Sequence, residues 1–165
     1  MSTAVFYVSA TLSLGSHSDE VEALQRSIHL QFHPHVALRV DGYFGPKTLA
    51  AVKYVQCVGG LPVDGVVGDR TRAFINRGAY SLQRLSLGNA GTAVEAVQQT
   101  LTAAIPLNLV QDGVYGHLTA TAVQLFQEQH CLIADGIVGP ETWNQIVTLR
   151  MEGSICRLFA DVPKL

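Results

Sequence analysis

One short pattern, Asp-Gly-x-x-Gly-x-x-Thr, occurs four times in this 165-residue chain at regular spacing. The four copies begin at Asp41, Asp64, Asp112 and Asp135. Within each pair the aspartates are 23 residues apart, and the two pairs are offset by 71 residues. A fixed period indicates a tandem duplication, here with a smaller repeat inside each copy. The chain is therefore predicted to consist of two similar units in series.

The pattern itself predicts a turn that leads into a helix. Glycine tolerates a positive φ, and aspartate accepts hydrogen bonds from the backbone ahead of it. Pro46 and Pro140 occupy the expected first helical position, where a missing N–H costs nothing. The threonine falls in the first helical turn, where we expect its side chain to satisfy a free amide. The structural turn motif comprises Asp41, Gly42, Gly45, Thr48, Asp64, Gly65, Gly68, Thr71, Asp112, Gly113, Gly116, Thr119, Asp135, Gly136, Gly139 and Thr142.

The hydrophobic spacing predicts a mainly α fold with three short helices in each copy, joined by Gly-rich loops. Val21, Leu24 and Ile28 follow the i, i+3, i+7 spacing of an amphipathic helix. The same spacing recurs in the second copy at Val94, Val97 and Leu101. Second helices are expected over 46–58 and 117–130, and third helices after the second turns. The expected organisation is an extended lead-in (1–13), repeat one (14–78), a junction (79–86), repeat two (87–149) and a C-terminal tail (150–165).

Composition and charge limit the partners. Hydrophobic residues make up 48% of the chain and charged residues 15%, which is typical of compact folding. The net charge of −2 gives no reason to expect nucleic acid, and no stretch approaches the ~20 apolar residues of a membrane span. Residues 15–78 hold seven Lys or Arg, whereas 88–149 hold none. Repeat one is therefore the better candidate for an anionic ligand, although drift between duplicated surfaces is an equal alternative.

The three cysteines give no disulfide or metal pattern. Cys57, Cys131 and Cys156 are odd in number, and none occupies an equivalent place in the two repeats. We expect small buried residues or unpaired thiols. His29, His33 and His35 are the best metal candidates, with the first two at i, i+4. No carboxylate completes their spacing, so neither a metal nor any other cofactor is expected.

The run LSLGNAGTAVEAVQQTL … DGVYGHLTATAVQLFQEQHCLIADGIVGPETWNQI resembles the peptidoglycan-binding-domain-1 family closely. Repeat two follows the family pattern nearly throughout, with Tyr115 for Phe and with Trp143 in place. Repeat one departs from it with Val55 for Phe and Arg72 for Trp. The resemblance covers roughly residues 12–149. It implies two three-helix modules that bind bacterial cell-wall peptidoglycan, a type of module usually attached to a lytic or remodelling enzyme.

We expect binding without catalysis. Residues 1–11 and 150–165 are too few to hold a catalytic fold, and the sequence contains neither Gly-x-Ser-x-Gly nor His-Glu-x-x-His. A muropeptide presents N-acetyl sugars and carboxylates, so a shallow site needs an aromatic face and cations. Such groups gather around the first turn of repeat one. The predicted ligand-binding residues are Arg39, Asp41, Tyr43 and Lys47.

Other polar and aromatic residues are assigned to structure. The matched glutamines, Gln25, Gln56, Gln98 and Gln127, are either ligand contacts or half-buried amides that close the loops, and the second interpretation is favoured. Trp143 and Tyr115 are expected in the core, whereas Tyr43 is expected at the surface.

Two alternative functions remain open. The chain is either a protein-interaction scaffold, within the cell or its envelope, or a targeting subunit for a separate lytic enzyme. The family implies the cell wall or periplasm, but no basic residue precedes the short apolar run at 4–12, so no signal peptide is evident. A cytoplasmic location is the alternative.

Overall fold

The computed structural model describes residues 11–160, without the side chain of Ala160, and the expected lead-in at 1–13 falls mostly outside them. The described chain is mainly helical, as predicted. Repeat one contains α1 (Asp19–Phe32), α2 (Pro46–Val58) and α3 (Asp69–Arg77), and repeat two contains α4 (Thr92–Ala104), α5 (His117–Gln129) and α6 (Pro140–Glu152). A 3₁₀ turn, η1 (Gly78–Ser81), lies in the junction, and α7 (Arg157–Ala160) lies in the tail.

Helices α1 to α6 begin close to where the sequence predicts, whereas α7 in the tail was not predicted. Ser18 caps α1, because its side chain accepts a hydrogen bond from the Val21 N–H. Pro46 and Pro140 are the first residues of α2 and α6, and glycines precede both helices. The apolar positions chosen from the periodicity are buried, as are Val52, Val55, Val123 and Phe126.

Isolated β-bridges close each repeat. His17 pairs with Tyr43 and Leu12 with Val67, both antiparallel. The corresponding pairs in repeat two are Ala90 with Val114 and Leu85 with Val138. The first bridge ties the first turn to the segment before the first helix. The second bridge ties the second turn to the segment that enters the repeat.

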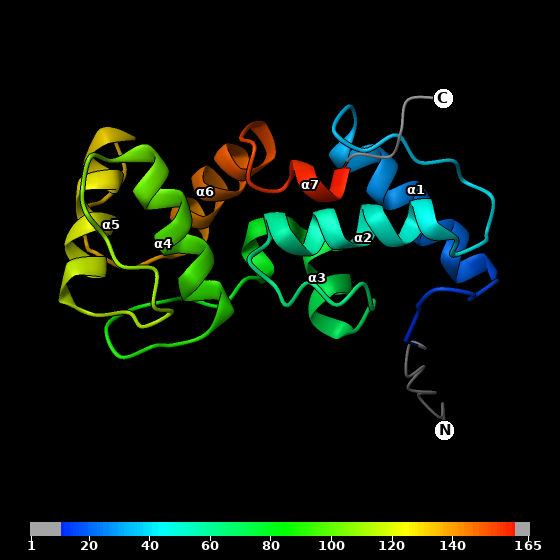
Figure 1. Ribbon diagram of the computed structural model, residues 1–165, viewed down its shortest axis with the longest axis horizontal. Coiled ribbons are helices and arrows are strands. Elements are labelled where there is room, and N and C mark those ends of the chain that lie inside the picture. Colours follow the sequence, from blue (N-terminus) through cyan, green and yellow to red (C-terminus); the bar gives the residue numbers. More distant parts are fainter. Residues whose placement is uncertain (1–10, 161–165) are drawn as a thin grey trace, which may run out of the picture.

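The two repeats lie side by side along the longest axis of the molecule, each around its own core (Figure 1). The tail does not stay with repeat two. Helix α6 runs back toward repeat one, and α7 lies against α2 (Figure 1). Val147 and Cys156 are part of the core of repeat one, with Met151, Ile155 and Phe159 packed against it. We call residues 147–159 the C-terminal clasp.

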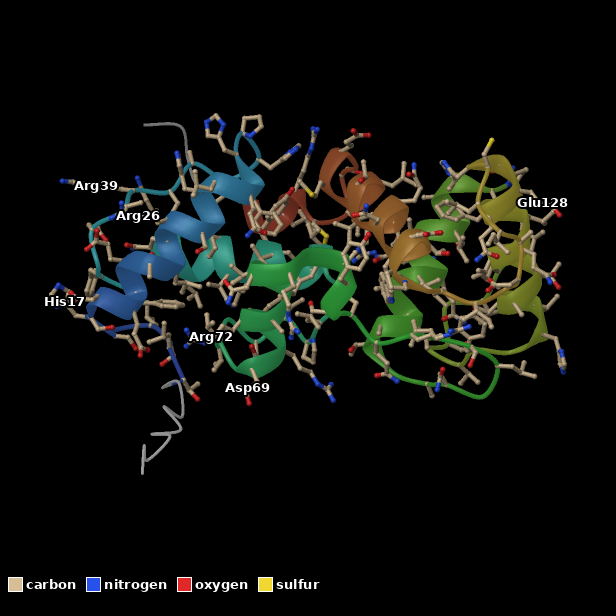
Figure 2. All side chains as sticks on the ribbon, turned by 180° about the vertical axis from the view of Figure 1, so that it is seen from behind. His17, Arg26, Arg39, Asp69, Arg72 and Glu128 are labelled. Carbon is tan, nitrogen blue, oxygen red and sulfur yellow. A yellow bond between two sulfur atoms is a disulfide. The ribbon has the colours of Figure 1, made fainter. Side chains whose placement is uncertain are left out.

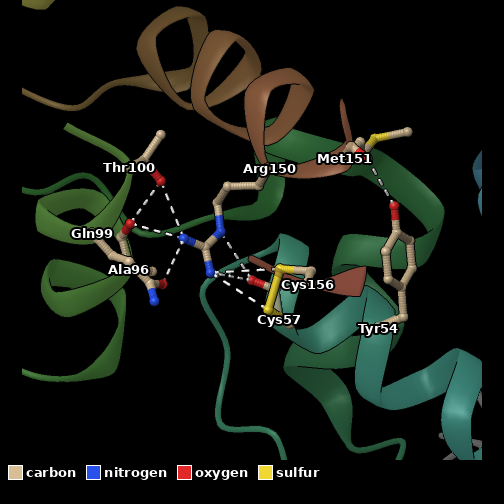
Figure 3. The surroundings of a disulfide bond; sticks show 8 residues. All are labelled: Tyr54, Cys57, Ala96, Gln99, Thr100, Arg150, Met151 and Cys156. Atoms are coloured by element: carbon tan, nitrogen blue, oxygen red, sulfur yellow. Dashed lines mark hydrogen bonds between the residues drawn. A yellow bond between two sulfur atoms is a disulfide. The ribbon is translucent and has the colours of Figure 1, made fainter. Parts of the chain in front are cut away.

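The cysteine prediction was wrong. Cys57 at the end of α2 forms a disulfide with Cys156 of the clasp, with Cα atoms 5.7 Å apart, and only Cys131 is a free cysteine. The comparison of equivalent positions missed this bond because it joins repeat one to a segment outside both repeats. Beside it, the Tyr54 hydroxyl donates to the Met151 carbonyl at 3.4 Å (Figure 3).

Candidate functional site

A buried glutamine organises the first turn of repeat one. The Gln25 amide nitrogen donates to the Asp41 carboxylate (2.9 Å), the Tyr43 carbonyl (2.9 Å) and the Thr48 hydroxyl (3.0 Å). Its amide oxygen accepts from the backbone N–H groups of Asp41 and Gly42, both at 2.9 Å. Every polar atom of this amide is thus engaged inside the turn. This confirms the structural interpretation of the glutamine.

The same network recurs in the other three turns. Gln56, Gln98 and Gln127 each donate to the aspartate, the third-position carbonyl and the threonine of their own turn, over 2.7–3.2 Å. Each also accepts from the first glycine's N–H at 2.8–2.9 Å. The threonine differs from its prediction: it caps no free helix amide. In the first turn, the Thr48 hydroxyl instead accepts a hydrogen bond from the Gln25 amide and donates one to the Tyr43 carbonyl.

This network favours the ionised form of Asp41 and of its equivalent Asp112. The Gln25 amide and then the Tyr43 N–H lower the pKa of Asp41, with a smaller effect from the charge of Arg39. The Gln98 amide and the Val114 N–H likewise lower the pKa of Asp112. Hydrogen bonds to the charged form produce this direction. Asp41 therefore holds the turn in shape, which limits its freedom to contact a ligand.

The other predicted site residues lie on the surface of that turn. Arg39, Tyr43 and Lys47 are exposed, and the exposed fraction of Tyr43 is 49%, as expected. The His17 ring lies 6.4 Å from the Tyr43 ring between centroids. Figure 2 shows His17 and Arg39 at the end of the molecule remote from repeat two. We call His17, Arg39, Tyr43 and Lys47 the first-turn surface.

Repeat two presents different chemistry at the matching positions. The bridge pairs match His17 with Ala90 and Tyr43 with Val114. Counting from the turn aspartates, Arg39 corresponds to Val110 and Lys47 to Leu118. Val110, Val114 and Leu118 are exposed by 67%, 50% and 64%. The same backbone thus carries two cations and a tyrosine in repeat one but only aliphatic groups in repeat two.

Sequence reasoning missed a cleft at the second turn of repeat two. The cleft is about 220 Å³ in volume, and Tyr80 and Arg84 of the junction line it with Ile133, Asp135 and Glu141. Tyr80 is 74% exposed. The junction supplies a cation and an aromatic ring to a repeat that has no Lys or Arg of its own. The sequence did contain a signal for this cleft, because Leu85 of the junction matches Leu12 before repeat one. The bridge from Leu85 to Val138 places the junction beside this turn.

The remaining aromatic and histidine residues have structural surroundings. Trp143 and Tyr115 are buried, as predicted, and donate to the carbonyls of Gln83 and Gly136, both at 2.8 Å. The His29 and His33 rings lie 5.3 Å apart, whereas His35 stacks on Tyr54. Within residues 11–159, no group of three His, Cys, Asp or Glu side chains is placed to hold a metal. No described helix is long and apolar enough to cross a membrane.

The two repeats match a known family. Residues 17–75 and 90–146 match the family described as "Putative peptidoglycan binding domain". The two matches together cover more than half of the chain. The chain therefore belongs to this peptidoglycan-binding domain family and carries two tandem copies of its domain.

Several relatives are named as amidases, and one is named as a carboxypeptidase. The chain is 31% identical over 163 residues to the N-acetylmuramoyl-L-alanine amidase CwlL of Bacillus licheniformis, covering 84% of this chain and 45% of that protein. It is 44% identical over 69 residues to a zinc D-Ala-D-Ala carboxypeptidase of Streptomyces albus G, covering 40% and 27%. The chain thus spans less than half the length of either relative.

A solved structure of a peptidoglycan-binding protein from Clostridioides difficile, in complex with glutamine hydroxamate, is also similar. The identity is 38%, with 41% of this chain and 42% of that chain covered and a TM-score of 0.39.

Proposed function

We propose that this chain binds peptidoglycan through its two repeats without cleaving it, and that the first-turn surface of repeat one makes the primary contact. The family match in both repeats supports the ligand class. The observation that carries the site is the contrast between equivalent turns. Arg39, Tyr43 and Lys47 stand exposed where repeat two has only aliphatic side chains.

The chemistry of the first-turn surface fits a wall fragment. The exposed Tyr43 ring offers an apolar face for a sugar or its N-acetyl methyl group. Arg39 and Lys47 offer cations for peptide or lactyl carboxylates, and Arg39 suits bidentate contact. Asp41 has a supporting part in this assignment, because its carboxylate is hydrogen-bonded within the turn.

The second-turn cleft is the other candidate contact, and it lies on repeat two. With contacts on both repeats, one chain engages two positions of a repetitive polymer. The second engagement is then intramolecular, which raises the apparent affinity without any new type of contact. The C-terminal clasp fixes the geometry of the repeats, so the polymer has to match their spacing.

Location and partners follow from the same proposal. The Cys57–Cys156 disulfide favours an oxidising compartment, which fits the cell wall better than a cytoplasmic scaffold. Two relatives are named as amidases. We therefore propose that these repeats serve a wall-lytic enzyme as its targeting part, whether that enzyme is attached or separate.

Co-sedimentation with protein-free sacculi tests the proposal. The variant Arg39→Val, Tyr43→Val, Lys47→Leu gives repeat one the residues of repeat two. It is expected to bind about tenfold or more weakly, the equivalent of ~1.4 kcal/mol. Arg77→Ala, which removes an exposed cation at the end of α3, is the matched control and should bind as the original chain does.

Each part of the proposal has its own contrary outcome. Unchanged sedimentation of the triple variant would remove the first-turn surface as the contact, and a loss with Tyr80→Ala and Arg84→Ala would then place it in the second-turn cleft. Failure to sediment with sacculi of several wall chemotypes would favour the scaffold alternative. Release of soluble muropeptides by the purified chain would contradict binding without cleavage.

A further inference from the structure

A groove runs between the two repeats, and neither repeat could form it alone. Two hollows of about 210 and 360 Å³ share Gly60, Leu61, Pro62 and Thr92 in their linings. Because these residues line both hollows, the hollows adjoin one another, and we call the two together the inter-repeat groove. The loop after α2 supplies one wall, and the beginning of α4 supplies the other.

Gly60 marks the place where the repeats touch. A Cβ atom at Gly60 would lie 2.9 Å from the Ala96 Cβ and 3.3 Å from the Trp143 ring, both in repeat two. The equivalent residue of repeat two is Cys131, which is exposed. Close contact at this position thus belongs to the pairing of the repeats and is absent from the turn of repeat two.

The groove is lined by a buried cation that has no carboxylate partner. Arg150 of α6 is only 3% exposed, yet it lines the larger hollow. Its guanidinium donates to the carbonyls of Cys57 and Ala96, to the Gln99 amide oxygen and to the Thr100 hydroxyl, at 2.9–3.2 Å (Figure 3). It also lies against both sulfurs of the disulfide, at 3.6 and 3.7 Å.

All of these acceptors are neutral, so no carboxylate is hydrogen-bonded to the guanidinium. Burial lowers the pKa of Arg150 to about 10, which leaves the side chain protonated at neutral pH. Buried charges are normally paired with an opposite charge. An anion seated in the groove would be attracted by this charge without contacting the guanidinium directly, because its N–H groups are already engaged by protein acceptors.

The neighbouring side chains supply hydrogen-bond donors and a second cation for such an anion. Gln99 gives its amide oxygen to Arg150, which leaves its NH₂ group as a donor, and Gln99 lines the same hollow. The Thr92 side chain lies where the hollows meet, and Arg70 supplies a second, exposed cation in the smaller hollow. Leu61, Ile155 and Phe159 provide apolar walls.

One acidic residue narrows the class of ligand. Glu95 is exposed and lines the larger hollow with Arg150 and Gln99. A ligand with a carboxylate alone would be repelled by Glu95, whereas a ligand that also carries an amine would be attracted to it. Cations and a carboxylate along one partly apolar groove suit an extended peptide that carries both charges.

We propose that the inter-repeat groove binds a short peptide with a free carboxylate and an amine, the chemistry of a peptidoglycan stem peptide. The carboxylate lies toward Gln99 and the guanidinium of Arg150, and the amine lies toward Glu95. This inference rests on the proposed function. It adds a composite peptide site that the tandem arrangement creates, distinct from the first-turn surface.

Titration of the isotope-labelled, oxidised chain with a synthetic stem peptide tests the groove. The peptide with its free carboxylate is expected to shift the backbone amide signals of Leu61, Thr92 and Gln99. The same peptide with a C-terminal amide should bind at least about tenfold more weakly, a difference of ~1.4 kcal/mol. Equal affinity for the two peptides would overturn the assignment.

Two variants locate the contacts and leave Arg150 an oxygen acceptor at position 99. Arg70→Ala and Gln99→Glu, which keeps that oxygen but removes the NH₂ donor, are each expected to weaken the free-carboxylate peptide about fivefold, or ~1 kcal/mol. Arg77→Ala, on the same helix as Arg70 but outside the groove lining, is the control and should leave the affinity unchanged. If the variants bind as tightly as the original chain, or if the peptide shifts only signals near Tyr43, the groove proposal is wrong.

The outcome is separable from that of the proposed function. Sacculi that still capture the chain while the peptide leaves the groove unperturbed would overturn the groove and keep wall binding. No capture by sacculi, together with no peptide binding, would overturn both. Peptide binding in the groove without capture by sacculi would support the groove and show that it recognises free peptides only.

Discussion

The two repeats share their turn chemistry and differ in almost everything placed on it. Gln25 and Gln98 make the same contacts to their aspartates, carbonyls and threonines. Around those contacts, Arg39 and Tyr43 face solvent in one repeat, and Val110 and Val114 do so in the other. Buried polar networks define the backbone of the turn, so the exposed positions are free to vary with function.

The cores differ in a similar way. Repeat one has Val55 and Phe74 where repeat two has Phe126 and Gln145, so each core contains an aromatic ring supplied from a different helix. The last helix is also longer in repeat two, with 13 residues in α6 against nine in α3. That added length carries Arg150 to repeat one. The difference between two equivalent helices thus creates one of the contacts between the repeats.

Removing the disulfide should have the largest effect on stability. Its two cysteines are 99 residues apart, so the bond restricts a long loop of the unfolded chain. Cys57→Ala with Cys156→Ala is expected to lower the free energy of unfolding by about 4 kcal/mol. Urea unfolding under oxidising conditions measures the change.

The free cysteine provides the control for that experiment. Cys131→Ser changes an exposed thiol on repeat two and should leave stability within about 0.5 kcal/mol. If the double alanine variant unfolds at the same urea concentration as the original chain, the clasp contributes little and the repeats are held by their other contacts.

The second-largest loss of stability is expected from the turn glutamines, and it should be equal in the two repeats. Gln56→Leu and Gln127→Leu each remove the amide that serves a buried threonine and a glycine N–H of the second turn. Buried polar groups left without partners cost about 1–3 kcal/mol each, so we expect each variant to lose roughly 3 kcal/mol.

Thermal unfolding of the two variants checks that expectation, with Gln129→Leu, an exposed glutamine at the end of α5, as the control. A large effect in one repeat and a negligible one in the other would show that the shared geometry does not carry equal energy.

Much of the fold could be predicted because the same sequence pattern recurs at fixed spacing in both repeats. Four copies of one turn, placed 23 and 71 residues apart, locate the starts of helices such as α2 and α6. Apolar spacing then identifies the buried face of α1. The glutamine role also followed, since buried amides have to be satisfied. These features are local or repeated, and a single sequence contains both kinds of signal.

Contacts between unlike segments could not be predicted in that way. The Cys57–Cys156 bond joins a repeat to a non-repeated tail, so comparing equivalent positions hides it. The second-turn cleft depends on Tyr80 and Arg84 of the junction, which the charge count of repeat two left out. Arg150 lies just beyond the repeat boundary, and only the packing of α6 shows that it is buried. The ligand-binding role of the first-turn surface stays a prediction.

Substitutions at one pair of equivalent positions, Gly60 and Cys131, are expected to change stability in opposite directions. Gly60 has φ +62°, and an added Cβ would press on Ala96, so Gly60→Ala should destabilise the chain by about 1–2 kcal/mol. Cys131 adopts φ 55° without a glycine. Cys131→Gly removes that strain and should stabilise the chain by about 1 kcal/mol. Urea midpoints of the two variants give both signs, and loss of stability in Cys131→Gly would contradict the strain argument.

The smallest effect on stability should appear at acidic pH, and it should again be equal in the two repeats. Hydrogen bonds lower the pKa of Asp41 and of its equivalent Asp112 below the ordinary value of 3.8. A carboxyl with a lowered pKa in the folded state stabilises above the unfolded pKa, because the unfolded chain binds its proton first. That contribution is lost as the pH falls from about 4 through the lower folded-state pKa.

Asp41→Asn and Asp112→Asn keep an oxygen for the turn N–H groups but remove the titration. Each variant is therefore expected to show a shallower loss of stability below about pH 4, while the slope above pH 5 stays the same. Urea midpoints measured at intervals from pH 6 to pH 2.5 give these slopes. An unchanged acid slope in Asp41→Asn alone would contradict a lowered pKa at Asp41, because the Gln25 amide and the charge of Arg39 both act in that direction. The two turns would then differ in their electrostatics as well as in their surfaces.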